Sequence, residues 1–186
     1  MLINARIMKK YSSFLGEEEL SELNEYIDRN YKNFIYYSVH MNLVNVKGWY
    51  NVPLKDPVIS YFANKYMKAM GQNKYIQQLY FLEYGPDSFA RIHEDSGTSL
   101  TSITILKQEG LIGGETIFRS EFDHKKNPTE GKTYLSSARV LKHPFISVCP
   151  ALPGDVLAYG PREEHGVAYT HSGLRRVMAI WMKDKR

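Results

Sequence analysis

The stretch Arg91-Ile92-His93-Glu94-Asp95-Ser96 places an imidazole and a carboxylate two residues apart, between segments with the composition of strands. Side chains alternate faces along an extended backbone, so we expect His93 and Asp95 to point the same way, near enough for one metal ion to bind both. A neutral imidazole and a carboxylate suit a divalent first-row metal. The triplet alone is weak evidence, because surface histidines are common, and a metal site needs a third ligand.

The best candidate for that third ligand is His165, which follows a predicted turn and strand. Two histidines and one carboxylate, with the rest of the coordination sphere open, form the facial triad of non-haem Fe(II) oxygenases. His171 is a near rival, although it stands only four residues before Arg175. Glu163 and Glu164 could compete as the carboxylate ligand, but beside a loop histidine they are expected to be solvated. The remaining histidines, His40, His124 and His143, are expected to be solvated or locally bonded.

Length and composition indicate a single globular domain, residues 1–186, with a core of its own. Apolar residues make up 43% of the chain and charged residues 24%, which is ordinary for a globular protein. The net charge of +4 is the difference between 24 basic and 20 acidic residues. It is too mild for the dense basic stripe of a nucleic-acid-binding protein. The single cysteine, Cys149, rules out an internal disulfide and is expected to be a buried strand residue.

The sequence has no apolar run long enough to cross a bilayer, and residues 1–14 lack the apolar region of a signal peptide. We therefore expect a cytoplasmic location and no membrane partner. The sequence gives no indication of the oligomeric state.

Two amphipathic helices are predicted before residue 75. The apolar spacing over residues 16–30 predicts the first, with three glutamates in its first turn, where the helix dipole favours them. The second should begin at Pro57, with Asp56 as its cap, and stop at Gly71. Between them, residues 34–46 are β-branched and aromatic, which predicts one or two strands.

Beyond the second helix the composition changes to short strands bounded by Gly, Pro, Asp or Ser. The predicted strands cover residues 74–84, 100–107, 115–119, 147–149, 156–159 and 174–183. This order predicts a mostly β fold with flanking α: an antiparallel sandwich or barrel braced by N-terminal helices. Residues 120–145 interrupt the pattern, and a loop of that length is either a solvated insertion or a lid over a pocket.

A conspicuous cation follows ten residues beyond His165, where Arg175 lies in the run GLRRVMAIW at residues 173–181. On a strand, Arg175 and Trp181 share one face, and Arg176 points to the other. Both faces are otherwise apolar, so two surface arginines on an edge strand fit poorly. If the first face lines a pocket, Arg175 is a buried cation that needs an anion. A guanidinium binds a carboxylate through two parallel hydrogen bonds.

In this order, the motifs resemble the prolyl-4-hydroxylase branch of the Fe(II)/2-oxoglutarate-dependent dioxygenases. The resemblance covers roughly residues 76–184, and its strength lies in the joint order and spacing of motifs that are weak one by one. Its glycine pair is also explained by a turn that needs positive φ. The motifs are His93-x-Asp95, Gly113-Gly114-Glu115-Thr116-x-Phe118, Pro153-Gly154-Asp155, and His165 followed by Gly173, Arg175 and Trp181.

The resemblance implies a double-stranded β-helix, or jelly roll, over residues 76–184 with an insertion at 120–145, supported by residues 1–75. It also implies roles for single residues. The metal ligands for Fe(II) would be His93, Asp95 and His165.

The resemblance further implies that Arg175 binds the distal carboxylate of 2-oxoglutarate, with Thr116 and Tyr84 as hydrogen-bonding partners. Two alternatives stay open. Thr116 could be a cross-strand residue without a ligand, and Tyr80 lies on the same face of the same predicted strand as Tyr84.

The implied reaction is hydroxylation of an unactivated C–H bond, with O2 consumed and 2-oxoglutarate decarboxylated to succinate and CO2. Ascorbate is a further cofactor that the resemblance allows. Asp95 favours hydroxylation over halogenation, because related halogenases carry a small residue at this position. The implied substrate is a prolyl residue in a peptide or protein, or a free amino acid or other small molecule.

Other classes stay open beside this one. A cupin-like jelly roll that binds metal or ligand without turnover is the main alternative, and the presence of the whole triad together with Arg175 counts against it. A zinc or manganese hydrolase would have no need of Arg175. A nucleic-acid substrate is disfavoured, because the alkylated-base demethylases carry a second arginine where this chain has Trp181.

Overall fold

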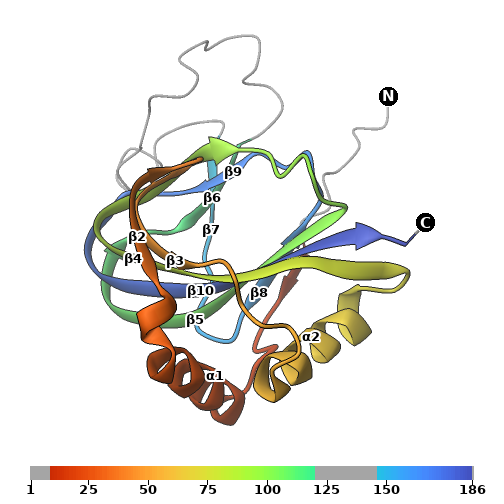
Figure 1. Ribbon diagram of the computed structural model, residues 1–186. Helices are drawn as coiled ribbons and strands as arrows, with labels where there is room; N and C mark the ends of the chain where they lie inside the picture. Colours follow the sequence, from red (N-terminus) through yellow and green to blue (C-terminus); the bar gives the residue numbers. More distant parts are fainter. Residues whose placement is uncertain (1–8, 120–145, 186) are drawn as a thin grey trace, which may run out of the picture.

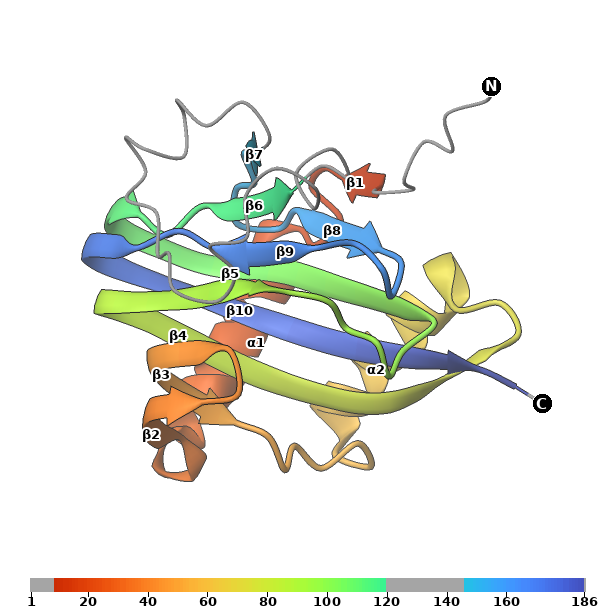
Figure 2. The same ribbon diagram turned by 90° about the horizontal axis from the view of Figure 1, so that it is seen from above.

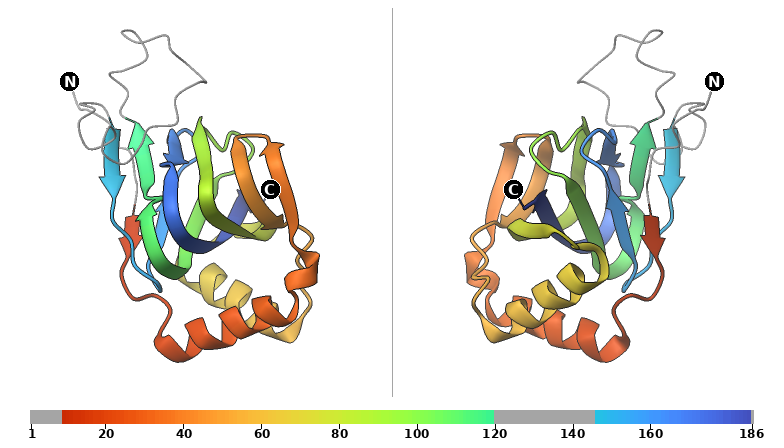
Figure 3. Two further views of the ribbon diagram at one scale, coloured as in Figure 1. Left: turned by 90° about the vertical axis from the view of Figure 1, so that its left-hand side faces the viewer. Right: turned by 90° about the vertical axis from the view of Figure 1, so that its right-hand side faces the viewer.

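The computed structural model describes residues 9–119 and 146–185. Its strands form an antiparallel sheet in the order β1-β8-β5-β10-β4-β9-β6-β7, and the β2–β3 hairpin extends it beside β4. The sheet curls on itself, and both helices lie against its outer side (Figures 1 and 3). The strands are β1 (Lys9–Tyr11), β2 (Ile35–His40), β3 (Leu43–Trp49), β4 (Lys74–His93), β5 (Leu100–Gly113), β6 (Thr116–Arg119), β7 (Ile146–Cys149), β8 (Val156–Tyr159), β9 (His165–Val167) and β10 (Thr170–Asp184).

This arrangement confirms the predicted mostly β fold with flanking helices. Among the described residues, no helix combines the length and the hydropathy needed to span a bilayer. The predicted insertion at 120–145, with His124 and His143, lies outside the described residues, and so does its predicted role as a lid.

Both predicted helices are present, as α1 (Glu17–Arg29) and α2 (Pro57–Met70), and a short 3-10 turn, η1 (Tyr31–Asn33), follows α1. The cap of α2 forms as expected. Asp56 Oδ1 accepts hydrogen bonds from the amides of Val58, at 3.0 Å, and Ile59, at 3.5 Å. These bonds satisfy two of the amides that a helix N-terminus leaves unpaired.

The helices bury their apolar stripes against one face of the long strands. Members of this core include Leu23 and Ile27 of α1, Ile59 and Phe62 of α2, and Met178 of β10. The opposite face of the same strands forms a second core, within the curl of the sheet, which includes Leu82, Tyr84, Ile105, Val177 and Ala179. Alternate residues of β10 therefore serve different cores, as the predicted strand register requires.

Strand β4 is much longer than predicted. The Gly85-Pro86-Asp87 segment has the composition of a turn, yet the strand continues through it to His93. The extra residues form a bulge in the pairing of β4 with β3. Val44 and Val46 of β3 pair with Phe89 and Tyr84, so β4 advances by five residues where β3 advances by two. Asp87 adopts a φ of 65° within this bulge.

Strands β5 and β10 also extend beyond their predicted ends, and β1 and β9 were not predicted. Gly173, with a φ of 80°, allows the extension of β10. A Cβ at this position would lie 2.3 Å from the carbonyl oxygen of Gly110, so only glycine lets the two strands approach here. Positive φ at Gly113 and Gly114 confirms the predicted turn.

Candidate metal centre and pocket

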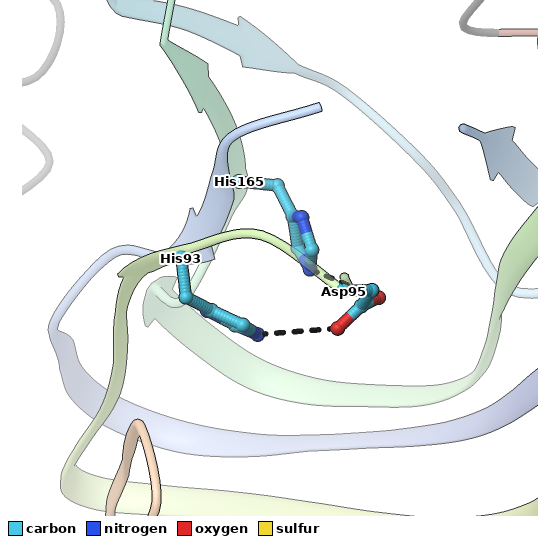
Figure 4. Close-up of side chains that lie close together, drawn as sticks. All are labelled: His93, Asp95 and His165. Atoms are coloured by element: carbon cyan, nitrogen blue, oxygen red, sulfur yellow. Dashed lines mark ion pairs between the residues drawn. The ribbon is translucent and has the colours of Figure 1, made fainter. Parts of the chain in front are cut away.

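Two antiparallel strands bring the predicted metal ligands together. His93 ends β4, His165 begins β9, and the two residues pair directly across the strands. Asp95 follows two residues after His93. Its oxygens lie 3.7 Å from His93 Nε2 and 3.6 Å from His165 Nε2 (Figure 4). One ligand atom from each residue lies within 4.8 Å of the other two, so a single ion could contact all three.

Backbone carbonyl groups orient both imidazoles. His93 Nδ1 lies 2.7 Å from the carbonyl oxygen of Arg91, and His165 Nδ1 lies 2.8 Å from that of Glu163. A carbonyl only accepts hydrogen bonds, so Nδ1 carries the proton and the Nε2 lone pair faces Asp95. Burial, and then the nearby His93, lower the pKa of His165 to about 4. His165 is therefore neutral at pH 7, the form that binds a metal.

Two threonines hold Asp95, the third predicted ligand. Thr101 Oγ1 donates a hydrogen bond of 2.8 Å to Asp95 Oδ2. The amide and hydroxyl of Thr98 both donate to the Asp95 carbonyl oxygen at 3.0 Å, closing a turn after the ligand. Sequence reasoning missed both threonines, although an aspartate followed by a threonine three residues later is a recognisable turn signal.

A cavity of about 210 Å³ extends from the triad into the curl of the sheet. Arg175, which is 1% exposed, lies in its wall. Arg175 Nη2 donates to Thr116 Oγ1 at 2.7 Å, and its Nη1 has no hydrogen-bond partner among the described residues. Within residues 9–119 and 146–185, no carboxylate lies within ion-pair distance of this guanidinium. Burial lowers the pKa of Arg175, but a guanidinium stays charged at pH 7.

Tyrosines form much of the remaining wall. Tyr84 and Tyr80 both line the cavity, and the Arg175 guanidinium carbon lies 5.3 Å from the centroid of the Tyr84 ring. Burial raises the pKa of Tyr84 to about 12, so its hydroxyl is a neutral donor. Tyr159, which sequence reasoning missed, is fully buried, and its ring centroid lies 4.4 Å from that of His165. Its hydroxyl has no hydrogen-bond partner in the described part of the chain. Nothing in its strand pattern distinguished it from a core tyrosine.

The neighbouring charges differ from expectation in one respect. Glu163 and Glu164 are buried, so the prediction that they are solvated is wrong. The Glu164 carboxylate binds the Arg119 guanidinium, with an Nε–Oε2 distance of 2.8 Å, which removes it from competition as a metal ligand. Cys149 is a buried strand residue, as predicted, and burial raises the pKa of its thiol.

Arg176 lies on the opposite face from Arg175, as predicted, but it is also buried. It binds Glu83 Oε2 through Nε and Nη2, and its Nη1 lies 2.8 Å from Asp28 Oδ1 on α1. This set of charges ties α1 to the sheet and lies away from the cavity. The alternative of two surface arginines is therefore wrong.

No family model matches the chain, and no curated protein matches its sequence. Solved structures do match its fold. HygX from Streptomyces hygroscopicus, with nickel, 2-oxoglutarate and hygromycin B bound, has a TM-score of 0.68 at 15% identity over 97% of this chain and 84% of HygX. The non-haem α-ketoglutarate-dependent epimerase SnoN from nogalamycin biosynthesis has a TM-score of 0.71 at 14% identity over 96% of this chain and 77% of SnoN.

A prolyl-4-hydroxylase from Pseudomonas putida has a TM-score of 0.66 at 12% identity, over 97% of this chain and 94% of the hydroxylase. At these identities the likeness concerns the fold. It confirms the predicted jelly-roll fold class. The chain thus has the double-stranded β-helix, or jelly-roll, fold of the Fe(II)/2-oxoglutarate-dependent oxygenases.

Proposed function

We propose that this protein is an Fe(II)- and 2-oxoglutarate-dependent dioxygenase that hydroxylates an unactivated C–H bond. One observation carries the proposal: a buried guanidinium with no carboxylate within ion-pair distance among the described residues shares a cavity with two histidines and one aspartate. A metal site that catalyses hydrolysis does not require a buried cation of this kind, because it binds no dicarboxylate co-substrate. A dicarboxylate co-substrate needs it, because one of its ends chelates the metal and the other requires a cationic partner.

Each residue then has a defined task. His93, Asp95 and His165 would hold Fe(II) through Nε2 and carboxylate oxygens, a donor set typical of non-haem iron. Arg175 would bind the distal carboxylate of 2-oxoglutarate, and Thr116 fixes the orientation of its guanidinium. The neutral hydroxyls of Tyr84 and Tyr159 are available as further donors within the same wall.

The bound metal and 2-oxoglutarate supply the oxidising chemistry, in which O2 is consumed and succinate and CO2 are released. The chain's own part is to position the reactants and exclude water. Leu82, Val177 and Ile103 line the cavity and keep it apolar around the triad. In this proposal residues 76–184 form the catalytic core and residues 1–75 its support, within one domain.

For the substrate, we include a prolyl residue of a polypeptide and a free amino acid in the proposal. The structural likeness to a prolyl-4-hydroxylase supports the first. HygX, which has hygromycin B bound in one structure, supports a small molecule. Ascorbate as an additional reductant belongs to the same proposal.

Anaerobic titration of the metal-free protein with Fe(II) and then 2-oxoglutarate tests the proposal. We expect the visible charge-transfer band that chelation of Fe(II) by 2-oxoglutarate produces, and its loss in Asp95→Ala and His165→Ala. His171→Ala is the matched control, because His171 is exposed and outside the cavity. A protein that binds iron but gives no band would contradict the proposal and favour a binding-only jelly roll.

A screen for succinate release follows from a positive titration. Proline-containing peptides and free amino acids are the first substrates to compare, because the proposal names both. Succinate release above the uncoupled background identifies the substrate, and mass spectrometry of the product locates the added oxygen.

A further inference from the structure

Strand β2 is an edge strand with an unusual surface. It pairs only with β3 among the described residues, so one side of its backbone has no strand beside it (Figure 2). Its sequence, IYYSVH, contains no Lys, Arg, Asp, Glu or Pro. Proteins normally protect an edge with such residues, because free N–H and C=O groups beside apolar side chains invite another strand to pair.

Exposed apolar side chains gather on this hairpin. Of the nine large apolar side chains that are exposed in the described part of the chain, four lie between residues 35 and 41. Ile35 is 59% exposed, Val39 60% and Met41 73%. The other five are scattered over the molecule. A cluster of this kind on a sheet edge marks an interaction surface.

The register of the hairpin connects this surface to the cavity. Ile35 and Tyr37 pair with Gly48 and Val46, so their side chains lie on the same face of the sheet as Val46. The faces change over at Asn45, which has a φ of 55°. Beyond it the His40 ring packs on those of Tyr37 and Tyr50, so Val39 points to the opposite face. Val46 belongs to the core within the curl, around the candidate metal centre. The side of β2 that carries Ile35 and Tyr37 is therefore an extension of the cavity's own face.

Aromatic contacts make this extension continuous. The Tyr37 ring lies 5.7 Å from that of Tyr50, which stacks at 5.0 Å on Tyr80 in the cavity wall. A second cavity, of about 380 Å³, is lined by Ile35, Tyr37 and Tyr50, and Tyr50 also lines the first. At the tip of the hairpin, Met41 lines the mouth of the first cavity.

From these contacts we infer that the substrate is a polypeptide segment that docks as an added strand along the free edge of β2. This inference rests on the proposed function. An extended chain would satisfy the edge with backbone hydrogen bonds, and its side chains would lie beside Ile35 and Tyr37 on one face of the sheet and beside Val39 on the other. Beyond Met41 it would reach the mouth of the cavity that holds the triad. A compact small molecule would leave this whole edge unused.

The test uses the full-length protein and a phage-displayed library of random dodecapeptides, without iron or 2-oxoglutarate. Enriched peptides are synthesised, and their affinities are measured by fluorescence anisotropy. We expect Val39→Lys and Ile35→Lys to bind them about tenfold or more weakly. Ile112→Lys is the matched control, because Ile112 is 62% exposed on β5 and lines neither cavity. Its affinity should equal that of the wild type.

Amide hydrogen exchange locates the bound peptide, and we expect exchange to slow at residues 35–40. The inference is wrong if no peptide is enriched, if Val39→Lys binds as well as Ile112→Lys, or if protection appears only elsewhere. It is also wrong if sedimentation shows a dimer that Val39→Lys dissociates, because the edge would then belong to a second copy of this chain.

The outcome is separable from that of the proposed function. Peptide docking on β2 without a charge-transfer band would keep the docking surface and remove the oxygenase. A band without β2-dependent docking would keep the oxygenase and assign it a small-molecule substrate.

Discussion

Adjacent arginines perform unlike tasks in this chain because strand geometry sends them to opposite faces. Arg175 donates to the Thr116 hydroxyl, and its Nη1 has no partner among the residues that the structure describes, whereas Arg176 is held by two carboxylates. The two carboxylates offset the free-energy cost of burying the Arg176 charge. Arg175 has no carboxylate within ion-pair distance among the described residues, and a bound anion would balance its buried positive charge.

Replacing Arg175 separates co-substrate binding from metal binding. We expect Arg175→Ala to weaken 2-oxoglutarate binding by about tenfold or more, because a charge-assisted fork is lost, with Fe(II) affinity unchanged. Arg175→Lys keeps the charge but loses the two parallel donors of the guanidinium. Its affinity for 2-oxoglutarate should therefore lie between those of the wild type and Arg175→Ala. Titration of the charge-transfer band measures both variants.

Arg176→Ala is the control for this assignment. It should lower the free energy of unfolding by about 3 kcal/mol, because the buried Glu83 carboxylate loses its ion-pair partner and keeps, among the described residues, only a hydrogen bond from Tyr31 and the more distant charge of Lys47. The folded fraction should bind 2-oxoglutarate normally. Weaker co-substrate binding in Arg176→Ala, with Arg175→Ala unaffected, would place the two side chains on the wrong faces.

Thr101 offers a test of how the aspartate ligand is oriented. Thr101→Val keeps the shape of the side chain and removes the hydroxyl that donates to Asp95 Oδ2. We expect metal affinity to fall about tenfold, the usual cost of losing a partner of a metal ligand. Ser102→Ala, one residue along β5, is the control, because the Ser102 hydroxyl has no hydrogen-bond partner within residues 9–119 and 146–185. Competition with a coloured chelator measures both, and equal affinities would refute the role of Thr101.

Sequence alone can identify the residues whose chemistry is unusual in their pattern. His93, Asp95, His165 and Arg175 are such residues, and the structure brings all four to one cavity. Thr101 and Tyr159 could not be identified in this way, because threonine and tyrosine are ordinary strand residues. What distinguishes them is their position across the fold from a ligand.

At the scale of elements, Gly173 decides whether β10 can run beside β5. We expect Gly173→Ala to cost about 2 kcal/mol or more in the free energy of unfolding, because φ is 80° and the Cβ would meet the Gly110 carbonyl oxygen. Gly160→Ala is the control, since a Cβ there meets nothing within 4 Å. Urea unfolding measures both, and equal losses would show that the close approach does not limit stability.

Among the elements, those with their own local signals were predictable. Helix α2 has its cap, its proline and its stop in the sequence, and it forms between those residues. Strand β4 did not follow its local signal, because pairing with β3 and β9 carries it through Gly85-Pro86-Asp87. Strand β9 has only three residues and forms because β4 and β6 flank it. Tertiary pairing decided both strands.

For the molecule as a whole, Asp155 links stability to pH. It accepts hydrogen bonds from the amides of Ser13 and Leu152, and Lys10 Nζ lies 2.9 Å away, so it fastens β1 to the sheet beside β8. Burial raises the pKa of Asp155, but the bonds from Leu152, Lys10 and Ser13 outweigh it and hold the pKa below 3.8. A carboxyl group with a lowered pKa stabilises the folded state at pH values above its ordinary, unfolded-state pKa. That stabilisation disappears as the pH falls through the folded-state pKa.

Asp155→Asn should therefore lose about 1–3 kcal/mol of unfolding free energy at pH 7, and the difference from wild type should shrink in acid. Asp184→Asn is the control, because Asp184 pairs with Lys74 at an exposed position, where ion pairs contribute little. Urea unfolding over a series of pH values tests this. A difference that stays constant into acid would show that the loss comes from packing.

The division into a support at 1–75 and a core at 76–184 stays a prediction. Composition could suggest it, because helices precede strands along the chain. It could not show that β3 of the first segment pairs with β4 of the second, because such pairing depends on register across distant residues.

The number of residues in the β4 bulge determines which face of the sheet His93 points to. Tyr84 lies before the bulge and His93 after it, so the same strand carries a proposed co-substrate contact and a proposed metal ligand in separate registers. Removing one residue from Gly85-Pro86-Asp87-Ser88 would shift the second half of the strand by one position and turn His93 to the opposite face. Substitutions at these four positions should therefore disturb the site less than the deletion of a single residue. Among relatives of this chain, the number of residues in the bulge should therefore vary less than their identity.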